Sequence, residues 1–365
     1  MNWKNLMANN AFFISAGDLS GEIHATYLVK EIKNLSTNTK IVSVGGHHLQ
    51  SVSDIFLDDI VNINAFGFFP IKSIFYLRKV LAKIKQNFLK NPPDKIILVD
   101  YYGFNILIAK LAKKFLIPVY YYISPQVWAS RKGRIKTLKE YIKKIFVILP
   151  FEEKLYREND VEVQFVGHPL IDRVFQKKSF EISNPPLIGL FPGSRQSIIK
   201  KHIPILIETA KILKKEIKAN FIMFSTSKTV SLNLPDFIEV DCSADLQKRE
   251  KINFAICPSG TVSLENALMG IPMAVFYKIS YFNYLLIKAI AKVKYITMVN
   301  ILSAKKIVPE FIQNDADPKK IAKFAIEQLE SKNYNFKIQE LLELRKMLGQ
   351  NNVAKRVAEG ILASL

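Results

Sequence analysis

The sequence predicts an α/β protein of two doubly wound domains, each a parallel sheet covered by helices, that face a cleft. Short apolar runs alternate with longer stretches of helical spacing along most of the chain, and this alternation is typical of parallel strands joined by helices. The chain also has 365 residues, more than one ordinary domain of about 150 residues needs. In doubly wound sheets, ligands bind at the carboxyl ends of the strands.

The first half of the chain carries the signals of one such domain. Apolar runs predict strands at residues 11–16, 40–44, 95–100, 119–123 and 145–149, and helical spacing predicts helices at 23–33 and 105–115. We expect this N-terminal domain to cover residues 1–170. A linker should follow at 171–186, where the chain is polar and ends in Pro185-Pro186.

The second half shows the same alternation. Strands are predicted at 187–191, 221–225, 237–240, 254–256 and 273–275, and helices at 204–217, with Pro204 near the start, and at 262–269. This C-terminal domain should cover residues 187–345. The tail from about residue 336 looks helical, and we expect its last part, 346–365, to return to the N-terminal domain.

Composition narrows the class of protein. The two cysteines, Cys242 and Cys257, are too few for a disulfide framework or a four-ligand zinc site, which fits a reducing compartment. Residues 1–10 lack the apolar stretch of a signal peptide. No uninterrupted apolar run reaches the roughly 18 residues of a membrane-spanning helix. Collagen-like, secreted and membrane-spanning classes are therefore not expected.

The chain is strongly basic. Lys and Arg number 52 and Asp and Glu 32, giving a net charge of +20. Such a charge suits a nucleic acid, a membrane surface or an anionic substrate. The lysines are spread along the whole chain, so an ordinary solvated surface is an equal alternative, and charge alone does not decide the function.

The first glycine-containing turn is Ala16-Gly17-Asp18-Leu19-Ser20-Gly21-Glu22, directly after a predicted strand. Its two glycines allow a tight turn and a close approach to a ligand, and the following helix offers free N–H groups. The G-x-G-x-x-G spacing of dinucleotide-binding proteins is absent. The alternative is an ordinary strand-to-helix turn capped by Ser20.

Two further turns favour phosphate binding. In Phe191-Pro192-Gly193-Ser194-Arg195, the backbone of Gly193 and Ser194 can donate to a phosphate and Arg195 can bind one through two hydrogen bonds. Cys257-Pro258-Ser259-Gly260-Thr261 precedes a predicted helix, whose start attracts anions. Glu265 lies one helical turn after Thr261, within reach of a ribose. Two such turns together suggest a nucleoside diphosphate.

Asp100 ends a buried strand, where its carboxylate could act as a general base or cap the next helix.

Residues 62–90 mix aromatic side chains, among them Phe66, Phe68 and Phe69, with lysines and arginines. This mixture suits a membrane interface. The alternative is a core helix with a basic outer face.

Other tempting signals are interpreted as structural. Asp317 before Pro318 is expected to cap a helix rather than bind a metal. His47-His48 is expected to lie in a loop. No G-x-S-x-G nucleophile turn or metal site is predicted.

Several segments in a fixed order resemble the lipid-A-disaccharide synthases, membrane-surface glycosyltransferases with two Rossmann-like domains (GT-B type). The resemblance runs from Phe13 to the C-terminal helix. Its most specific segments are Ser124–Ala129 (SPQVWA), Phe165–Leu170 (FVGHPL), Pro192–Arg195 (PGSR), Ser259–Thr261 (SGT) with Leu264-Glu265, and Val308–Gln313 (VPEFIQ).

The resemblance implies that UDP-2,3-diacylglucosamine and 2,3-diacylglucosamine 1-phosphate are joined to a β-1,6-linked disaccharide 1-phosphate, with release of UDP. It implies that the donor is bound by Gly193, Ser194, Arg195, Ser259, Gly260, Thr261, Glu265, Asn300 and Gln313. Asp100 matches an aspartate of the family that precedes a Phe-Asn pair, here Phe104-Asn105. The aromatic residues Phe66–Phe69 would contact acyl chains.

The chain departs from the family pattern at three places. The first turn usually reads Ala-Gly-Glu-x-Ser-Gly-Asp, whereas here the two acids are exchanged as Asp18 and Glu22. Val299 replaces a common proline before Asn300. Lys305 and Lys306 lie where the family usually has Gly-Arg, so a bidentate arginine contact is in doubt.

As a mechanistic hypothesis, the acceptor 6′-hydroxyl attacks the anomeric carbon in one inverting step. Asp100 takes the proton, while Arg195 and the helix start at Thr261 stabilise the leaving diphosphate in place of a metal. No cofactor is expected. The expected partners are acylated sugars and the anionic inner membrane, which the protein would bind peripherally from the cytoplasm, and a homo-oligomer is left open.

Two other functions stay open. Another UDP-sugar glycosyltransferase or an epimerase of the same architecture is the nearer alternative. A nucleic-acid-binding protein is the remote one, since no helix-turn-helix, ribonucleoprotein or zinc-finger pattern supports it.

Overall fold

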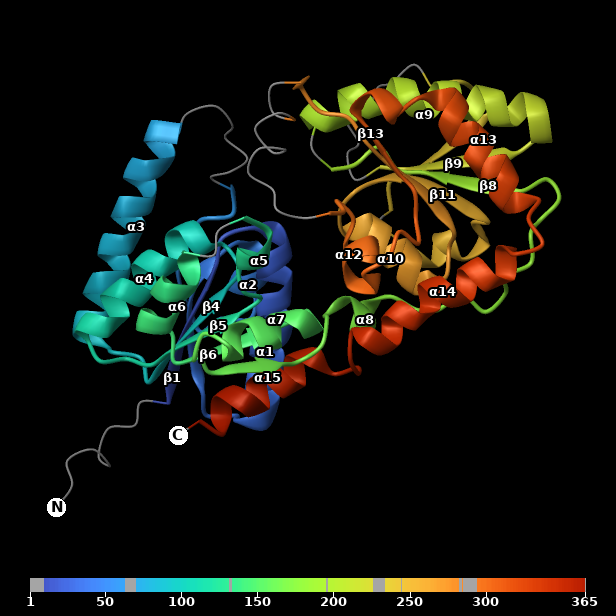
Figure 1. The fold of residues 1–365 in the computed structure, drawn as a ribbon. Coiled ribbons are helices and arrows are strands. Elements are labelled where there is room, and N and C mark those ends of the chain that lie inside the picture. The colour runs from blue at the N-terminus through green and yellow to red at the C-terminus, as the bar shows by residue number, and fades with distance from the viewer. Residues whose placement is uncertain are drawn as a thin grey trace. The chain divides into compact units, whose positions relative to one another are not determined.

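The computed structural model describes residues 10–62, 70–130, 133–194, 196–225, 234–243, 245–281, 284 and 294–364. The chain divides into two compact units (Figure 1). Unit 1 comprises Met1–Pro169 and Leu348–Leu365, and unit 2 comprises Leu170–Met347. The predicted fold class, α/β with two doubly wound domains, is confirmed.

In the described part of unit 1, seven parallel strands form a sheet with the order β3-β2-β1-β4-β5-β6-β7. Their bounds are β1 Ala11–Ala16, β2 Lys40–Gly45, β3 Ile55–Asp59, β4 Lys95–Val99, β5 Val119–Tyr122, β6 Lys144–Val147 and β7 Val163–Phe165. The helices are α1 Leu19–Leu35, α2 His47–Gln50, α3 Pro70–Lys90, α4 Tyr102–Lys114, α5 Val127–Ser130, α6 Arg134–Tyr141, α7 Pro150–Arg157 and α15 Val353–Leu362.

Alternate strand residues of unit 1 enter two separate cores. Phe13, Ile96 and Leu98 pack with side chains of α3, α4, α6 and α7. Phe12 and Ile97, which point to the other face, pack with side chains of α1, α2 and α15. Because successive strand side chains point to opposite faces, a continuous apolar run is what a sheet covered on both sides requires.

Unit 2 has a sheet of the same kind, in which the described residues form six parallel strands ordered β10-β9-β8-β11-β12-β13. The strands are β8 Leu187–Leu190, β9 Asn220–Phe224, β10 Ile238–Asp241, β11 Phe254–Pro258, β12 Met273–Tyr277 and β13 Glu310–Ile312. The helices are α8 Leu170–Arg173, α9 Gln196–Ile217, α10 Thr261–Met269, α12 Met298–Ser303, α13 Pro318–Leu329 and α14 Tyr334–Met347, with 3₁₀ helices at Leu246–Lys251 and Gln313–Asp315.

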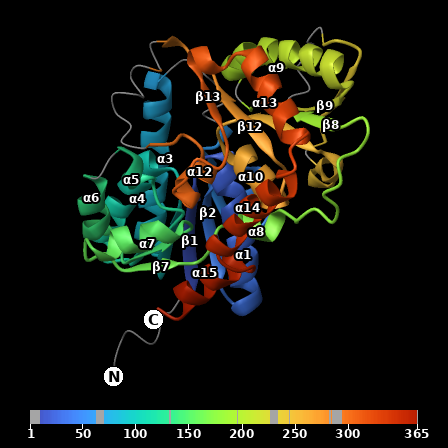
Figure 2. The ribbon, with the colours of Figure 1, turned by 45° about the vertical axis from the view of Figure 1, so that its right-hand side comes forward.

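Within unit 2, α9 and α13 cover one face of the sheet, and α10, α12 and α14 lie on the other (Figures 1 and 2). In both sheets the strand order reverses beside the first strand, between β1 and β4 and between β8 and β11. Such a reversal opens a crevice at the carboxyl ends of these strands. The loops that follow β1, β4, β8 and β11 are therefore where a ligand site is expected.

The C-terminal helix is part of unit 1. Figures 1 and 2 both show α15 beside α1, and the two helices are in contact. The buried Lys95 donates from Nζ to the carbonyl of Ile361 at 2.5 Å, at the end of α15. Arg356 donates from Nε and Nη2 to the carbonyl of Val166 at 2.9 and 2.7 Å. These contacts fasten the helix to β4 and to the end of β7.

The segment expected as a linker lies on unit 2 and is held there by a buried amide. Asn253 Oδ1 accepts from Ser183 Oγ at 2.7 Å and from Leu187 N at 2.9 Å, and its Nδ2 donates to the carbonyl of Glu181 at 2.9 Å. Lys177 adds a hydrogen bond from Nζ to the carbonyl of Ile252 at 2.5 Å. Residues 177–187 are thus attached to the start of β11.

Most predicted strands are confirmed within a residue or two, and the N-cap role of Asp317 is confirmed as well. The structure adds β3, β7 and β13, which were not predicted. His47-His48 begins the short helix α2 instead of lying in a loop. The tail forms two helices, because Gly349 and Asn352 adopt positive φ between α14 and α15.

The predicted start of the helix at Pro204 is wrong. Helix α9 begins at Gln196, so Pro204 lies inside it. A proline there removes one backbone hydrogen bond. The buried side chains of Ile199, Ile203 and Leu206 continue one apolar face through the proline, and their packing holds the helix together.

None of the helices in the described ranges combines the length and the apolar character needed to cross a bilayer.

Candidate functional site

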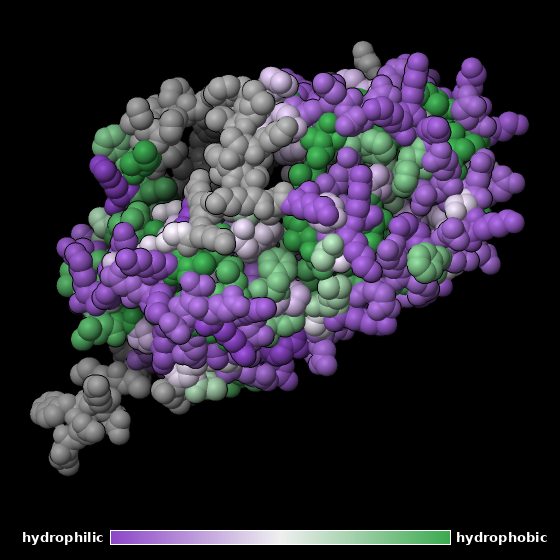
Figure 3. All heavy atoms as spheres, viewed as in Figure 1, coloured by the Kyte–Doolittle hydropathy of each residue, from purple (hydrophilic) through white to green (hydrophobic). Residues whose placement is uncertain are grey.

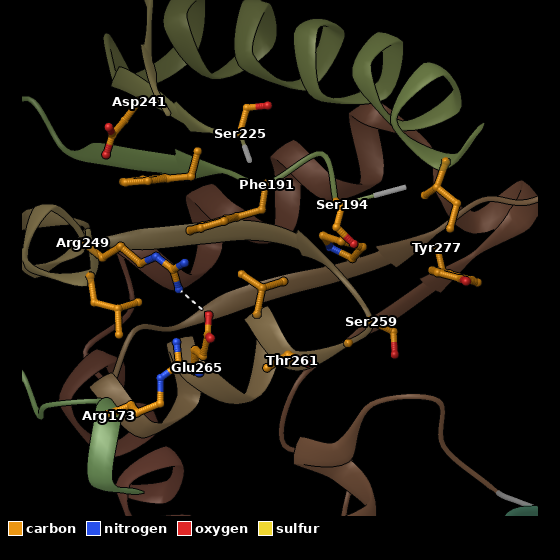
Figure 4. A pocket seen from close by; sticks show the side chains of 17 residues that line it. Arg173, Phe191, Ser194, Ser225, Asp241, Arg249, Ser259, Thr261, Glu265 and Tyr277 are labelled. Atoms are coloured by element: carbon orange, nitrogen blue, oxygen red, sulfur yellow. Dashed lines mark hydrogen bonds and ion pairs between the residues drawn. The ribbon is translucent and has the colours of Figure 1, made fainter. Parts of the chain in front are cut away.

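Unit 2 contains a pocket of about 470 Å³ beside the carboxyl ends of β8, β9, β11 and β12 (Figure 4). Six residues predicted to bind a donor nucleotide line it together: Gly193, Ser194, Ser259, Gly260, Thr261 and Glu265. Arg195, predicted to bind the diphosphate, lies outside the described residues. The two predicted phosphate turns, residues 191–195 and 257–261, are far apart in the sequence and meet at one pocket.

The backbone of both turns is shaped for close approach. Gly193 has φ +102° and Gly260 has φ +150°, conformations that residues with a Cβ rarely adopt. Helix α10 begins at Thr261, and the first N–H groups of a helix have no partner within it. This end of the pocket is therefore suited to an anion.

A buried histidine supports the first turn from behind. His202 Nδ1 lies 3.0 Å from the carbonyl oxygen of Pro192, and its Nε2 accepts from the backbone N–H of Lys278 at 3.2 Å. This pattern requires the neutral tautomer with the proton on Nδ1. Burial lowers the pKa of His202 and keeps the ring neutral. The histidine thus links the turn after β8 to the end of β12.

The carboxylate of Glu265 is paired with an arginine in the pocket. Its Oε2 forms an ion pair with Arg249 Nη1 at 2.8 Å, and the Arg249 guanidinium lies against the ring of Phe191 (Figure 4). Sequence analysis missed Arg249, Phe224 and Asp241 as pocket residues. Arg249 lies in the run Lys248-Arg249-Glu250-Lys251, which looks like a solvated charged surface and gives no signal of a pocket.

Asn300 and Gln313 are not among the residues that line this pocket. The fully buried Asn300 accepts at Oδ1 from the N–H groups of Ile307 and Val308, and donates from Nδ2 to Val308 O and Glu310 Oε1, all at 2.9–3.0 Å. Its amide is therefore fully used in joining α12 to the segment before β13. Gln313 likewise accepts from Ile279 N at 2.9 Å.

Asp100 lies in a strained turn at the end of β4 in unit 1. Asp100 and Tyr101 have φ of 48° and 45°, both in the left-handed region. The carbonyl of Asp100 accepts from Tyr121 Oη at 2.5 Å and from Asn105 Nδ2 at 2.8 Å, and Asn105 in turn accepts from Ser15 Oγ at 2.7 Å. Asn105, the second residue of the Phe-Asn pair, thus holds this turn in place.

The turn after β1 lies against the turn after β4. A Cβ on Gly17 would overlap the ring of Tyr101, so this glycine is required by close packing, and Gly21 lies in van der Waals range of Asp100, since a Cβ there would meet Asp100 Cβ at 3.5 Å. Asp18 accepts from Gly21 N at 2.6 Å and is the N-cap of α1. The alternative interpretation of this turn named Ser20 as its cap, but Ser20 lies exposed within the first turn of α1 and the cap is Asp18.

These two turns bring two carboxylates close together. Burial, and then the negative charge of Asp18, raise the pKa of Asp100 to about 6, against an opposing hydrogen bond from Tyr101 N. A carboxylate with that pKa is ionised at neutral pH and basic enough to accept a proton during a reaction. Asp100 therefore has the electrostatics of a general base.

Glu22 has a different role from Asp18. Its carboxylate is fully buried and accepts from the backbone N–H groups of His48 and Leu49, the latter at 3.2 Å. Gly46 leaves the space that this carboxylate occupies. Glu22 therefore fixes α2 to α1. Of the two exchanged acids, Asp18 and Glu22, the longer one lies at the position from which a side chain must reach the backbone of α2.

The SPQVWA segment surrounds another buried carboxylate that sequence analysis missed. Glu152 accepts from Trp128 Nε1 at 3.2 Å, from Ser124 Oγ at 3.4 Å and from Leu149 N at 3.2 Å. Burial raises the pKa of Glu152 to about 7 despite these hydrogen bonds. Trp128 and Ser124 thus shape the edge of unit 1 after β5.

Phe66, Phe68 and Phe69 lie outside the described residues. Among the described residues, no group of three or more His, Cys, Asp or Glu side chains is arranged to hold a metal ion.

Comparison with known proteins gives consistent results. Residues 12–364 match the family described as lipid-A-disaccharide synthetase. The chain is 33% identical over 373 residues to a lipid-A-disaccharide synthase of Coxiella burnetii, covering 97% of this chain and 98% of that one. It is 38% identical over 339 residues to lipid-A-disaccharide synthase 1 of Legionella pneumophila, covering 85% and 86%.

A solved structure described as a putative UDP-N-acetylglucosamine 2-epimerase from Listeria monocytogenes is similar in fold. Its TM-score is 0.65 at 13% sequence identity, and the match covers 98% of this chain and 96% of that one. At such low identity the likeness bears on the fold alone.

The first prediction concerns Asn300. Asn300→Ala leaves the backbone N–H groups of Ile307 and Val308 and the carbonyl of Val308 without their side-chain partner, so we expect the free energy of unfolding to fall by about 2–4 kcal/mol. Thermal and urea unfolding will measure the change. Asn335→Ala, at an exposed position of α14, is the control and should change little. Wild-type stability of Asn300→Ala would contradict a structural role.

The second prediction concerns the carboxylate pair. Asp18→Asn keeps a good N-cap and removes the negative charge that disfavours ionisation of Asp100, so the pKa of Asp100 should fall below about 6. Titration of the Asp100 carboxyl carbon by NMR measures this shift. Asp160→Asn, which removes the negative charge of a side chain that is 86% exposed, is the matched control and should leave the pKa of Asp100 unchanged. An unchanged pKa in Asp18→Asn would show that the two carboxylates do not interact.

Proposed function

This chain belongs to the lipid-A-disaccharide synthetase family, and we propose that it joins UDP-2,3-diacylglucosamine to 2,3-diacylglucosamine 1-phosphate. The protein is a glycosyltransferase of lipid A synthesis. The proposed products are the β-1,6-linked disaccharide 1-phosphate and UDP. The observation that carries the proposal is the pocket of unit 2, at which the two predicted phosphate turns and Glu265 come together.

In this pocket the UDP part of the donor would be bound by groups with distinct tasks. Gly193, Ser194 and the start of α10 at Thr261 offer donors for the diphosphate, and Glu265 offers a carboxylate for the ribose hydroxyls. Ser259 donates from Oγ to Ile296 O at 2.7 Å, so its task is to hold the second turn. Asn300 and Gln313 would contribute by holding the surrounding segments.

Asp100 is the proposed base for the acceptor. It would take the proton of the attacking 6′-hydroxyl, while Arg195 and the N–H groups at the start of α10 stabilise the charge of the leaving UDP. We propose that this charge stabilisation suffices without a divalent metal. The raised pKa of Asp100, about 6, supports its role, because a weaker base would accept the proton less readily.

We also propose peripheral attachment to the cytoplasmic face of an anionic membrane through α3. Ile74 and Phe75 are 52% and 64% exposed, and they lie within residues 62–90, the stretch that mixes aromatic and basic side chains. Hydrophobic and hydrophilic side chains lie side by side where Figure 1 shows α3 (Figure 3). From residue 74 onward, the exposed cations of this helix are Arg78, Lys79, Lys83, Lys85 and Lys90. Apolar side chains beside cations suit the boundary between acyl chains and phosphate headgroups.

The reaction can be tested with the purified protein and the two acylated sugars. We expect release of one UDP per disaccharide formed, unaffected by EDTA. Arg195→Ala should lower kcat by about 10²–10³-fold and Asp100→Asn by about 10²–10⁴-fold, with both proteins folded by circular dichroism. Absence of disaccharide from the wild-type protein would refute the reaction. A rate within a few-fold of wild type in either variant would refute the role of that residue.

Membrane attachment can be tested by sedimentation with liposomes. Binding to vesicles that contain anionic lipid should weaken as salt rises from about 50 to 500 mM, because the cations of α3 are screened. Replacing Lys79 and Lys85 by Gln should weaken binding at low salt, whereas the same change at Lys211 and Lys214 on α9 is the control. Binding that is insensitive to salt and to the α3 variant would contradict the proposal.

A further inference from the structure

One wall of the pocket in unit 2 is built from an ion pair and two stacked aromatic rings. Arg249, from the 3₁₀ helix Leu246–Lys251, pairs with Glu265 of α10 at 2.8 Å, and their side chains are only 12% and 15% exposed. Figure 4 shows the Arg249 guanidinium directed at the Glu265 carboxylate across the pocket wall. This is the most buried cation–carboxylate pair among the ion pairs of the described residues.

The rings hold the guanidinium in place. The rings of Phe191 and Phe224 are stacked, with centroids 5.0 Å apart and planes 11° from parallel. The guanidinium carbon of Arg249 lies 5.0 Å from the centroid of Phe191 and 5.7 Å from that of Phe224. An arginine against aromatic faces is attracted to them and loses rotational freedom. The two rings therefore restrict the Arg249 side chain on one side, and Glu265 pairs with its guanidinium on another.

Stability does not explain why this arginine is buried. Its Nε is buried and has no hydrogen-bond partner among the described residues, which is costly for a charged group. Buried ion pairs rarely stabilise a protein more than apolar residues of the same volume would. A buried pair that is incompletely satisfied and borders a pocket points to a role in binding.

The pair constrains the carboxylate in two ways. First, it holds Oε2 and so fixes the rotation of the carboxylate, which is otherwise broad for a glutamate. Among the described residues no hydrogen bond to Oε1 occurs, so this oxygen is left for a ligand. Second, the positive charge offsets the repulsion between Glu265 and a diphosphate bound at the nearby start of α10.

We propose that Arg249 is a positioning residue that orients Glu265 toward the ribose of the donor and thereby makes the pocket select ribonucleotides over 2′-deoxyribonucleotides. Arg249 itself acts through the carboxylate and touches no reacting atom. The inference rests on the proposed function, because it takes UDP as the nucleotide of this pocket. A carboxylate held in one orientation can accept from both ribose hydroxyls, whereas a freely rotating one gains less from the second hydroxyl.

The test compares the binding of UDP and 2′-deoxy-UDP by calorimetry, using the full chain. Wild-type protein should prefer UDP by roughly ten-fold or more, the usual effect of one hydrogen bond to a charged group. Arg249→Met keeps a long apolar side chain against the rings and removes the fork of N–H donors. It should weaken the binding of UDP by roughly ten-fold more than that of 2′-deoxy-UDP, so that the preference nearly vanishes, while the lost positive charge weakens the binding of both nucleotides to a common smaller extent.

Three further variants test whether the preference for UDP depends on the pair of Arg249 and Glu265. Glu265→Gln should also lose the preference. Lys251→Met removes one positive charge from the same 3₁₀ helix at an exposed position and should keep the wild-type preference. Arg249→Lys keeps the charge without the planar fork and should show a reduced preference, which provides the test if Arg249→Met does not fold.

The outcomes separate the two proposals. If the wild-type protein binds neither nucleotide, the donor pocket itself is refuted, and the inference with it. If the wild type prefers UDP and Arg249→Met keeps the same preference, the role of Arg249 is overturned while the donor pocket stands. Equal weakening of both nucleotides in Arg249→Met would also overturn it, since that is the result of a purely structural defect.

Discussion

Burial of both faces of each parallel sheet is the constraint on which the rest of this structure depends. A strand covered on both sides leaves little room for polar side chains away from its ends, so the functional groups gather where the strands stop. In unit 1, the ends of β1 and β4 bring Asp18 and Asp100 together. In unit 2, the ends of β8 and β11 bring residues 193–194 and 259–261 to one pocket.

The carboxyl-end edges of the two sheets place their carboxylates in different electrostatic surroundings. At the edge of unit 1, Asp100 is kept in a left-handed turn by hydrogen bonds to its carbonyl from Tyr121 and Asn105, and such a conformation persists only where its surroundings enforce it. Burial and a neighbouring carboxylate make it a stronger base. The pocket of unit 2 pairs its carboxylate with an arginine instead, so that a negative ligand is not repelled.

The sequence was sufficient to predict the alternation of strands and helices and the meeting of the two phosphate turns, because both follow from local pattern and from the topology of parallel sheets. It was insufficient for contacts between distant side chains. Nothing local distinguishes Arg249 from the charged residues beside it, and only the fold brings it to Glu265. The alternative interpretation of the first turn named Ser20 rather than Asp18 as the cap of α1, because both are good N-caps and the start of a helix is poorly defined by sequence.

Resemblance to a family also does not separate residues that bind a ligand from residues that hold the binding residues in place. Three side chains in or beside the recognised segments form their hydrogen bonds with other parts of the protein: Asn105, Asn300 and Glu152. The exchanged acids Asp18 and Glu22 illustrate the same point. A short side chain suits an N-cap, whereas a longer one reaches α2 over Gly46, so the exchange changes the side chains without requiring that Asp100 move. The chemistry of the site therefore depends on a few carboxylates and cations. Many of the other residues in the recognised segments hold the loops that position these groups.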